Sequence, residues 1–218
     1  MAPFITFEGI DGCGKSTQVQ LLYSYLTNQG LKVSLLREPG GTSVGELIRS
    51  ILLSNQTSNL LPISELLLYS AARNQNIHEN IVPALNDGVW VLCDRFKDAT
   101  VAYQGYGLNL DLNLIKFLND LVSQNRKPDM TILIDIDPNI ALARARKRNL
   151  KNHNEEGRYE QESLTFFHQV RKGYLEIAKK EPGRIHIING SQSINKIQNE
   201  IIQLIMPLLC TGEINGIP

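Results

Sequence analysis

A glycine-rich loop between an apolar segment and an amphipathic one constrains this 218-residue chain most strongly. Residues 9–16 read Gly-Ile-Asp-Gly-Cys-Gly-Lys-Ser and fit the pattern G-x-x-x-x-G-K-S/T, directly after the apolar run "FITFE". Glycines let backbone N–H groups turn inward around phosphate oxygens, and the N-terminus of the following helix adds partial positive charge. The loop therefore predicts a nucleoside triphosphate site at the end of a strand.

The residue types within this loop predict separate tasks. Lys15, expected to be partly exposed, would reach the β- and γ-phosphates, and the Ser16 hydroxyl would coordinate Mg²⁺. Cys13 has two interpretations: an accessible thiol activated by the helix N-terminus and protected by nucleotide, or a small residue with a shielded sulfur. The residues expected to hold the nucleotide phosphates are Gly9, Ile10, Asp11, Gly12, Cys13, Gly14, Lys15, Ser16 and Thr17.

Short apolar runs alternate with longer amphipathic runs along the chain. Strands are predicted at 4–9, 32–38, 89–95, 130–137 and 184–190. Helices are predicted near 15–29, 44–54, 64–86, 111–125, 138–148, 160–181 and 193–209. This alternation predicts an α/β fold of the P-loop NTPase type, with a doubly wound five-stranded parallel sheet and helices on both faces. We expect a single domain over residues 1–209 and a disordered tail over 210–218.

Composition excludes several classes of protein. Lys and Arg number 22 and Asp and Glu also 22, so no overall positive charge attracts nucleic acid. No apolar stretch approaches the roughly 20 residues of a membrane span. Three cysteines without metal-site spacing, and a start without a signal-peptide pattern, predict a cytoplasmic protein.

Carboxylates follow three of the predicted strands, and in two of these strings an arginine lies beside the carboxylate. These strings are Arg37-Glu38-Pro39-Gly-Gly-Thr42, Asp94-Arg95-Phe96 and Asp135-Ile-Asp137-Pro138. Ligands bind at the carboxyl ends of strands in such sheets, where arginine holds phosphate and a carboxylate holds Mg²⁺ through water. The alternative for any one string is a salt bridge without a function. The base-reading motif of GTPases and the catalytic motifs of protein kinases are not found in the sequence.

A basic cluster occupies residues 141–158 of this otherwise neutral chain. It contains Arg144, Arg146, Lys147, Arg148, Lys151 and Arg158. Arg144 and Arg148 are four residues apart and share a helix face. The cluster is either a solvated basic helix face or a mobile lid, over about residues 144–159, that closes arginines over a transferring phosphoryl group. We favour the lid.

Together these strings resemble the thymidylate kinase family over about residues 3–209. The pieces that carry the resemblance are "FEGIDGCGKST", "REPGGT", "YSAAR", "CDRF", "AYQG" and "RYEQES". The resemblance implies transfer of the ATP γ-phosphoryl group to dTMP to give dTDP for dTTP synthesis, with Mg²⁺, in a protein that is usually a homodimer. Neither a nucleic acid nor a membrane is expected as a partner.

The resemblance also implies roles for side chains around the acceptor. Tyr69, where the family more often has phenylalanine, would stack on the thymine, and Arg73 would hydrogen-bond its carbonyl. Thr100 would lie near the polar edge of the base, and Tyr103 would close the sugar pocket against a 2′-hydroxyl. The residues expected to bind dTMP are Asp11, Glu38, Arg49, Tyr69, Arg73, Arg95, Thr100, Tyr103 and Gln104.

The remaining expected roles concern the 3′-hydroxyl, the phosphates and the metal. Asp11 would accept from the sugar 3′-hydroxyl, and Arg95 with Arg49 would hold the acceptor phosphate. The residues expected at or near the metal are Ser16, Asp94 and Glu38.

Gly12 occupies a loop position where some family members carry an arginine. The catalytic positive charge must then come from the lid, as in the bacterial-type arrangement, and we favour Arg148 among its arginines. The expected catalytic residues are Lys15, Arg95, Arg146 and Arg148. No general base is required, because a phosphate monoester with a second pKa of about 6 is already a dianion at neutral pH.

Two other functions remain open at this point. One is a kinase acting on a different nucleoside monophosphate with the same fold. The other is a P-loop switch that binds nucleotide and signals to a partner protein, which the missing GTPase motifs and the lid argue against.

Overall fold

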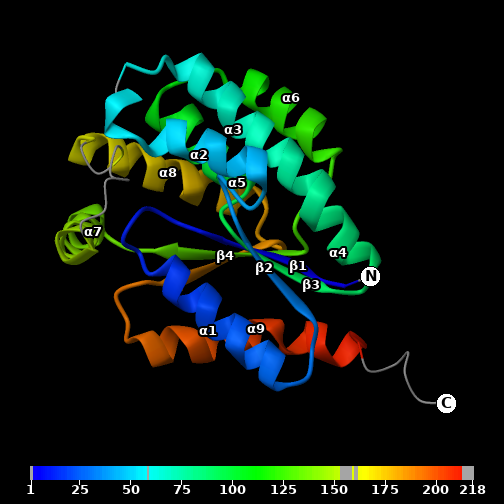
Figure 1. Cartoon of the computed structure of the whole chain (residues 1–218). Helices are drawn as coiled ribbons and strands as arrows, with labels where there is room; N and C mark the ends of the chain where they lie inside the picture. The colour runs from blue at the N-terminus through cyan, green and yellow to red at the C-terminus, as the bar shows by residue number, and fades with distance from the viewer. Residues whose placement is uncertain (1, 58, 153–158, 160–161, 213–218) are drawn as a thin grey trace.

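The computed structural model in Figure 1 describes residues 2–57, 59–152, 159 and 162–212. Its strands are β1 (Phe4–Glu8), β2 (Val33–Arg37), β3 (Trp90–Asp94), β4 (Met130–Asp135) and β5 (Ile185–Asn189). They form one sheet in the order β2-β3-β1-β4-β5, and every neighbouring pair is parallel. The predicted doubly wound, five-stranded parallel sheet is therefore confirmed. The strands β2 and β3 lie on one side of β1, and β4 and β5 lie on the other. Ligands in such sheets bind in the crevice at the carboxyl ends of the strands, where the strand order changes side.

Helices cover both faces of the sheet (Figure 1). On one face lie α1 (Lys15–Asn28) and α9 (Ile194–Gly212). On the other lie α3 (Pro62–Asn76), α4 (Val82–Asn86), α5 (Lys97–Thr100) and α8 (Leu164–Lys180). The helices α2 (Ser43–Leu53) and α6 (Leu112–Ser123) each pack against α3. The helix α7 (Pro138–Asn152) follows β4 at the carboxyl-terminal end of the sheet.

Two helical predictions differ from the structure. The single helix expected over 64–86 contains a π-helical segment, Ile77–Ile81, between α3 and α4. Pro83 lies just after that segment and has no backbone N–H to donate to a preceding turn. The helical region over 97–107, formed by α5 and the π-helical segment η3 (Val101–Gly107), was not expected at all. Its two glycines lower helix propensity, and tertiary packing overrides that preference.

The boundaries of two late helices extend beyond the predictions. The helix α7 continues to Asn152, four residues past the expected end, and α9 continues to Gly212 instead of ending at residue 209. Residues 210–212, expected in a disordered tail, are therefore helical. Residues 213–218 of that tail and 153–158 of the proposed lid lie outside the described residues, as do residues 160–161 just after the lid.

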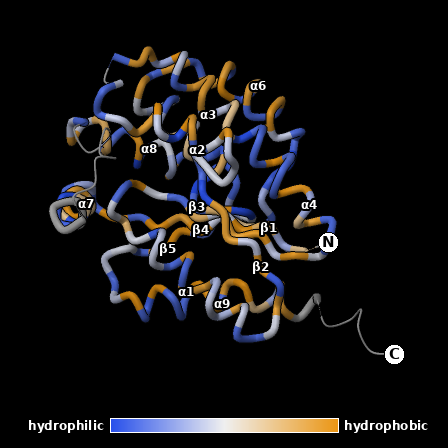
Figure 2. The backbone as a smooth tube through the Cα atoms, in the orientation of Figure 1, coloured by the Kyte–Doolittle hydropathy of each residue, from blue (hydrophilic) through white to orange (hydrophobic). Residues whose placement is uncertain are grey.

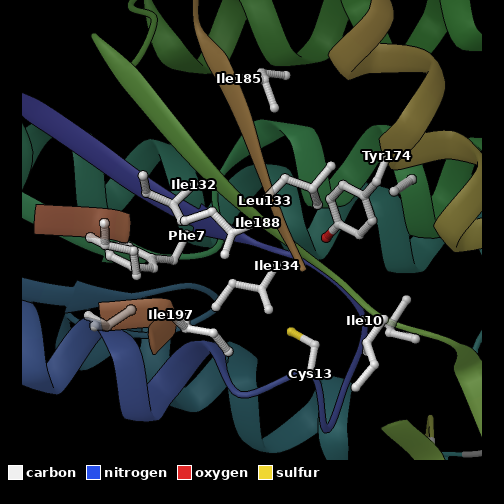
Figure 3. Close-up of a cluster of buried hydrophobic side chains, with 14 of the residues drawn as sticks. Phe7, Ile10, Cys13, Ile132, Leu133, Ile134, Tyr174, Ile185, Ile188 and Ile197 are labelled. Atoms are coloured by element: carbon white, nitrogen blue, oxygen red, sulfur yellow. The ribbon is translucent and has the colours of Figure 1, made fainter. Parts of the chain in front are cut away.

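The hydrophobic core lies on both faces of the central strands. All five residues of β1 are buried, and β3 and β4 are buried at every position except their last. Figure 2 shows these strands as a continuous hydrophobic band through the middle of the molecule. In Figure 3, Ile10 and Cys13 of the glycine-rich loop join the same core as Ile134 and Ile188. Core packing thus fixes the loop to the sheet.

Candidate active site

A cavity of about 700 Å³ opens at the carboxyl ends of the strands. Its size falls in the range typical of small-molecule sites. It is lined by residues from the glycine-rich loop, from the segments after β2 and β3, and from α3 and α7. The predicted site residues that line it are Asp11, Gly12, Cys13, Gly14, Lys15, Ser16, Thr17, Glu38, Arg49, Tyr69, Arg73, Asp94, Arg95, Thr100, Tyr103 and Gln104.

The glycine-rich loop approaches neighbouring backbone too closely for side chains. A Cβ on Gly9 would lie 2.5 Å from the carbonyl oxygen of Ile134, and one on Gly12 would lie 2.0 Å from that of Ala141. Both glycines also have positive φ angles, 136° and 82°, which other residues rarely adopt. The loop is therefore wedged between the end of β4 and the first turn of α7.

Lys15 is folded into the loop rather than partly exposed as expected. Its side chain is only 5% exposed. Its Nζ donates to the carbonyl oxygens of Gly9 at 2.9 Å and of Ile10 at 3.2 Å. The ammonium thus sits inside the ring of backbone that surrounds it, while Lys15 still lines the cavity. Gly9 and Ile10 contribute these carbonyls and do not themselves line the cavity.

Cys13 is buried, which contradicts the accessible-thiol interpretation. Its exposure is 1%, and its Sγ lies 3.8 Å from the Lys15 Nζ. Burial raises the pKa of the Cys13 thiol, although the nearby charge of Lys15 works against this shift. Cys13 is thus a small loop residue whose sulfur is shielded in the hydrophobic core (Figure 3).

We expect iodoacetamide not to modify Cys13 in the native protein, with or without ATP. The buried thiol is neutral, and the thiolate is the reacting species. Peptide mass spectrometry after brief alkylation measures this, and the same reaction in guanidinium chloride provides the fully labelled control. Native labelling that ATP suppresses would restore the accessible-thiol interpretation.

Ser16, at the start of α1, and Asp94, at the end of β3, form a hydrogen bond at the wall of the cavity. The Ser16 hydroxyl donates to the Asp94 Oδ2 at 2.8 Å. A hydroxyl beside one carboxylate suits Mg²⁺, which keeps several waters and takes its other ligands from phosphates. The described residues contain no group of three His, Cys, Asp or Glu side chains that would hold a metal by themselves.

Arg73 is the centre of a buried hydrogen-bond network below the cavity. It is 2% exposed; its Nε donates to the Glu38 Oε2 at 2.7 Å, and its Nη1 donates to Thr100 and Asn119, both at 2.9 Å. Its Nη2 donates to the carbonyl oxygen of Phe96 at 3.1 Å. Four of its five N–H groups therefore have partners in the protein.

Glu38 faces this network rather than the Ser16–Asp94 pair. Its second oxygen accepts from Asn76 at 3.2 Å, so both carboxylate oxygens are engaged. Burial raises the pKa of Glu38, and the charge of Arg73 works against that shift. The place of Glu38 near a metal stays a prediction, and its contacts favour a role in orienting Arg73.

Arg95 points into the cavity from the end of β3. Its Nη2 donates to the Asp11 Oδ1 at 2.7 Å and to the Tyr103 hydroxyl at 3.0 Å, and that hydroxyl donates to the Asp11 Oδ2 at 2.8 Å. Burial acts to raise the pKa of Asp11, but the charges of Arg95 and Lys15 outweigh it and hold that pKa well below its usual range. Asp11 is thus an anion that holds Arg95 at the cavity wall.

The aromatic side of the cavity combines Tyr69 and Tyr103 with a residue from the far end of the proposed lid. Tyr159 is buried, and its ring lies edge-on to that of Tyr103 at 5.3 Å between centroids. The Gln104 Nε2 donates to the Tyr159 hydroxyl at 3.0 Å and to the Glu65 Oε1 at 2.8 Å. The Tyr159 hydroxyl also donates to that Glu65 oxygen.

Sequence reasoning missed the supporting residues Glu65 and Asn119. Glu65, Tyr69 and Arg73 are four residues apart and share one face of α3, which was a readable signal for Glu65. Asn119 comes from α6 and meets Arg73 only through the packing of α6 on α3. No local pattern indicates it.

The arginines expected near the phosphates fall into three groups. Arg49 lines the cavity and donates from Nη1 to the carbonyl oxygen of Pro39 at 3.0 Å. Arg144 also lines the cavity and donates from Nη1 to the carbonyl oxygen of Gly190 at 3.0 Å. Arg146 is exposed and is not among the lining residues. The side chain of Arg148 lies outside the described part of the structure.

Comparison with known proteins assigns the chain to one family. The sequence profile of the thymidylate kinase family matches residues 7–201. A thymidylate kinase from Geotalea daltonii is 46% identical over 99% of this chain and 100% of that relative. A thymidylate kinase from Citrifermentans bemidjiense is 49% identical over 90% of this chain and 88% of its own length.

A solved structure agrees with these sequence matches. The crystal structure of thymidylate kinase from Ehrlichia chaffeensis superposes with a TM-score of 0.75 at 39% identity, covering 94% of this chain and 98% of the other. The cavity and its phosphate loop thus lie in a chain that belongs to the thymidylate kinase family.

Proposed function

We propose that this protein transfers the γ-phosphoryl group of ATP to dTMP, giving ADP and dTDP for dTTP synthesis. One observation supports this most: a phosphate loop, a strand-end arginine and an aromatic, Arg73-based pocket all open into one cavity. Such an arrangement suits two phosphates facing each other, with a nucleobase held at the far end. Membership of the thymidylate kinase family supports the choice of acceptor.

On the donor side, the loop residues Gly9 to Thr17 would hold the ATP phosphates. Backbone N–H groups of the loop and the Lys15 ammonium would meet the charge on the phosphate oxygens. We propose that Ser16 and Asp94 hold Mg²⁺, which would neutralise part of the charge on the transferring group when bound.

On the acceptor side, Arg95 and Arg49 would hold the dTMP phosphate. Asp11 and Tyr103 lie where they would meet the sugar, close to Arg95. The base would stack on Tyr69 and meet Arg73, with Thr100 and Gln104 at its edge. The one N–H of the Arg73 guanidinium without a partner among the described residues is an Nη2 hydrogen, and it would donate to a thymine carbonyl.

Catalysis would then consist of alignment and charge neutralisation. The dTMP phosphate is a dianion at neutral pH and needs no base to activate it. The protein must bring two anions into line and compensate their charge, which accounts for a site rich in arginine and lysine. Lys15 and Arg95, which both line the cavity, would serve this purpose, and Arg146 and Arg148 of the proposed lid would complete the set.

Turnover with a panel of acceptors tests this function. Purified protein with ATP and Mg²⁺ should form ADP rapidly only when dTMP is added, and more slowly with dUMP, UMP or AMP. Preference for another monophosphate would indicate a different acceptor. Nucleotide binding without acceptor-dependent ADP formation would instead favour the P-loop switch.

We expect kcat/KM for dTMP to exceed that for dUMP by about 10–200-fold. The two acceptors differ by one methyl group, which is worth about 1–3 kcal/mol in a fitted apolar pocket. Steady-state kinetics with both nucleotides at fixed ATP measures the ratio. Equal values of kcat/KM would contradict a pocket shaped for thymine.

We also propose that the protein is a homodimer that associates through α2, α3 and α6. Each of these adjacent helices exposes an apolar pair at i and i+4: Leu47 and Ile51, Ile63 and Leu67, and Phe117 and Leu121. Monomers rarely expose large apolar patches, and a stable interface covers about 800 Å² on each partner.

Leu121→Glu is expected to convert the dimer to a monomer. Leu121 is 63% exposed, so the change should leave the fold intact while placing a charge in an apolar interface. Met206→Glu on α9 is the matched control, because Met206 is also exposed, at 46%, but lies across the sheet. Sedimentation velocity distinguishes the species. A wild-type monomer, or a Leu121→Glu dimer, would contradict this surface.

No helix in the described ranges is long and apolar enough to cross a membrane. A location in the cytoplasm, and the absence of nucleic acid or membrane as partners, stay predictions from the sequence. The zero net charge supports the absence of a nucleic-acid partner.

A further inference from the structure

Arg95 adopts a backbone conformation that the rest of the structure must hold in place. Its φ angle is 70°, in the left-handed region that a long side chain rarely adopts. Its own N–H donates to the carbonyl oxygen of Phe7 at 2.9 Å. The next N–H, that of Phe96, donates to the Glu8 Oε1 at 2.8 Å. The turn that aims Arg95 is therefore fastened to the last two residues of β1.

The same Glu8 carboxylate also reaches the side chain of Arg95 through one intermediary. The Tyr174 hydroxyl donates to the Glu8 Oε2 at 2.8 Å and accepts from the Arg95 Nη1 at 3.1 Å. Tyr174 comes from α8, and Figure 3 shows its ring reaching from that helix towards the sheet. Glu8 is fully buried and does not line the cavity. It cannot contact a nucleotide directly.

We propose that Glu8 is a positioning residue that, together with Tyr174, orients Arg95 towards the acceptor phosphate. This inference rests on the proposed function, in which Arg95 holds the phosphate of dTMP. One carboxylate oxygen fixes the strained backbone after Arg95, and the other fixes its guanidinium through the tyrosine. The backbone and the guanidinium of Arg95 are thus both held in place by the side chain of one residue on the central strand β1.

A purely structural role for Glu8 explains the geometry less well. A buried carboxylate costs free energy unless both oxygens have partners, and an apolar residue would avoid that cost in this core. Burial and the nearby charge of Asp98 act to raise the pKa of Glu8, and the charge of Arg95 and the hydrogen bonds from Phe96 and Tyr174 work against that shift. Among the described residues, the Glu8 oxygens accept hydrogen bonds from the Phe96 N–H, in the turn after Arg95, and from the Tyr174 hydroxyl.

Tyr174→Phe and Glu8→Gln test the proposal by comparing dTMP with thymidine. Tyr174→Phe removes the link to the guanidinium and keeps the ring. Glu8→Gln offers one acceptor where the structure uses two, so one of its hydrogen bonds is lost. Tyr106→Phe is the matched control, because the Tyr106 ring packs beside Gly173 on the same helix pair and its hydroxyl has no hydrogen bond to a described residue.

The expected loss is confined to the phosphate. A hydrogen bond to a charged group corresponds to a change of roughly 10–100-fold, so Kd for dTMP should rise by about tenfold in both variants. The Kd values for thymidine and for ATP should change less than about twofold, and Tyr106→Phe should match the wild type in all three. Titration calorimetry, or competition where binding is weak, provides the values. Thermal unfolding monitors the fold.

The outcomes separate this inference from the proposed function. If the wild type does not phosphorylate dTMP, the proposed function is wrong and the inference falls with it. If the wild type is active but the variants lose dTMP and thymidine binding equally, the role of Glu8 is structural and the inference alone is overturned. Unchanged dTMP binding in Tyr174→Phe would overturn it as well.

Discussion

Replacing Lys15 by alanine is expected to lower kcat by about 10³-fold while the protein remains folded. Preorganised charges aimed at a developing anion are worth about 10²–10³ in rate when a single donor is removed, and Lys15 carries a full charge inside the loop. Among the described residues, its Nζ bonds only the carbonyl oxygens of Gly9 and Ile10 and the Cys13 sulfur. Because Lys15 lines the cavity, water can replace those contacts in the variant.

Lys32→Ala serves as the control for this change. Lys32 precedes β2, is exposed, and does not line the cavity. Steady-state kinetics at saturating ATP and dTMP gives kcat for both variants, and circular dichroism verifies the fold. A Lys15→Ala enzyme with wild-type kcat would show that the loop does not hold the transferring phosphate.

Arg148→Ala is expected to reduce kcat by about 10²–10³-fold and to leave dTMP affinity nearly unchanged. An arginine that meets the transferring phosphoryl group is worth about 10³–10⁵ in related reactions, and neighbouring arginines would replace part of that effect. The loop cannot supply such an arginine, because a Cβ on Gly12 would collide with the carbonyl oxygen of Ala141. We therefore predict that an arginine of α7 supplies this positive charge.

The position of α7 supports this source. Its first turn contacts the loop at Gly12, and Arg144 already lines the cavity one turn before Arg148. Lys147→Ala is the matched control, since Lys147 is an exposed cation next in sequence. Kinetics and calorimetric dTMP binding test the two halves of the prediction. Normal kcat in Arg148→Ala would favour a solvated basic helix face.

Burial on both faces made the central strands readable from the sequence. The apolar runs of β1, β3 and β4 are covered by helices on either side, so their pattern is nearly continuous and their boundaries were predicted within one or two residues. The region over 97–107 was missed for the opposite reason. Gly105 packs against Leu112 and Gly107 against Phe166, so helix forms there through tertiary contacts that no local preference reveals.

The residues of the candidate site likewise include some that the sequence predicted and some that it did not. Residues at strand ends and in the loop were predictable because strand topology alone brings their Cα atoms together. The partners of those residues were not. Glu38 with Arg73, and Glu8 with Tyr174, join segments 35 and 166 residues apart in sequence, and only packing specifies such pairs. The exposure of Lys15 was mispredicted because its charge is met by carbonyl groups of its own loop.

Arg73 enters any binding event with its side-chain conformation already fixed. Four protein acceptors hold its guanidinium, so a nucleobase that meets its remaining N–H would not have to immobilise a flexible side chain. The entropy of ordering that donor was lost when the chain folded. In the proposed function, base selectivity and the stability of the fold would therefore depend on the same contacts. Selection for either property would act on residues such as Asn119, which does not line the cavity.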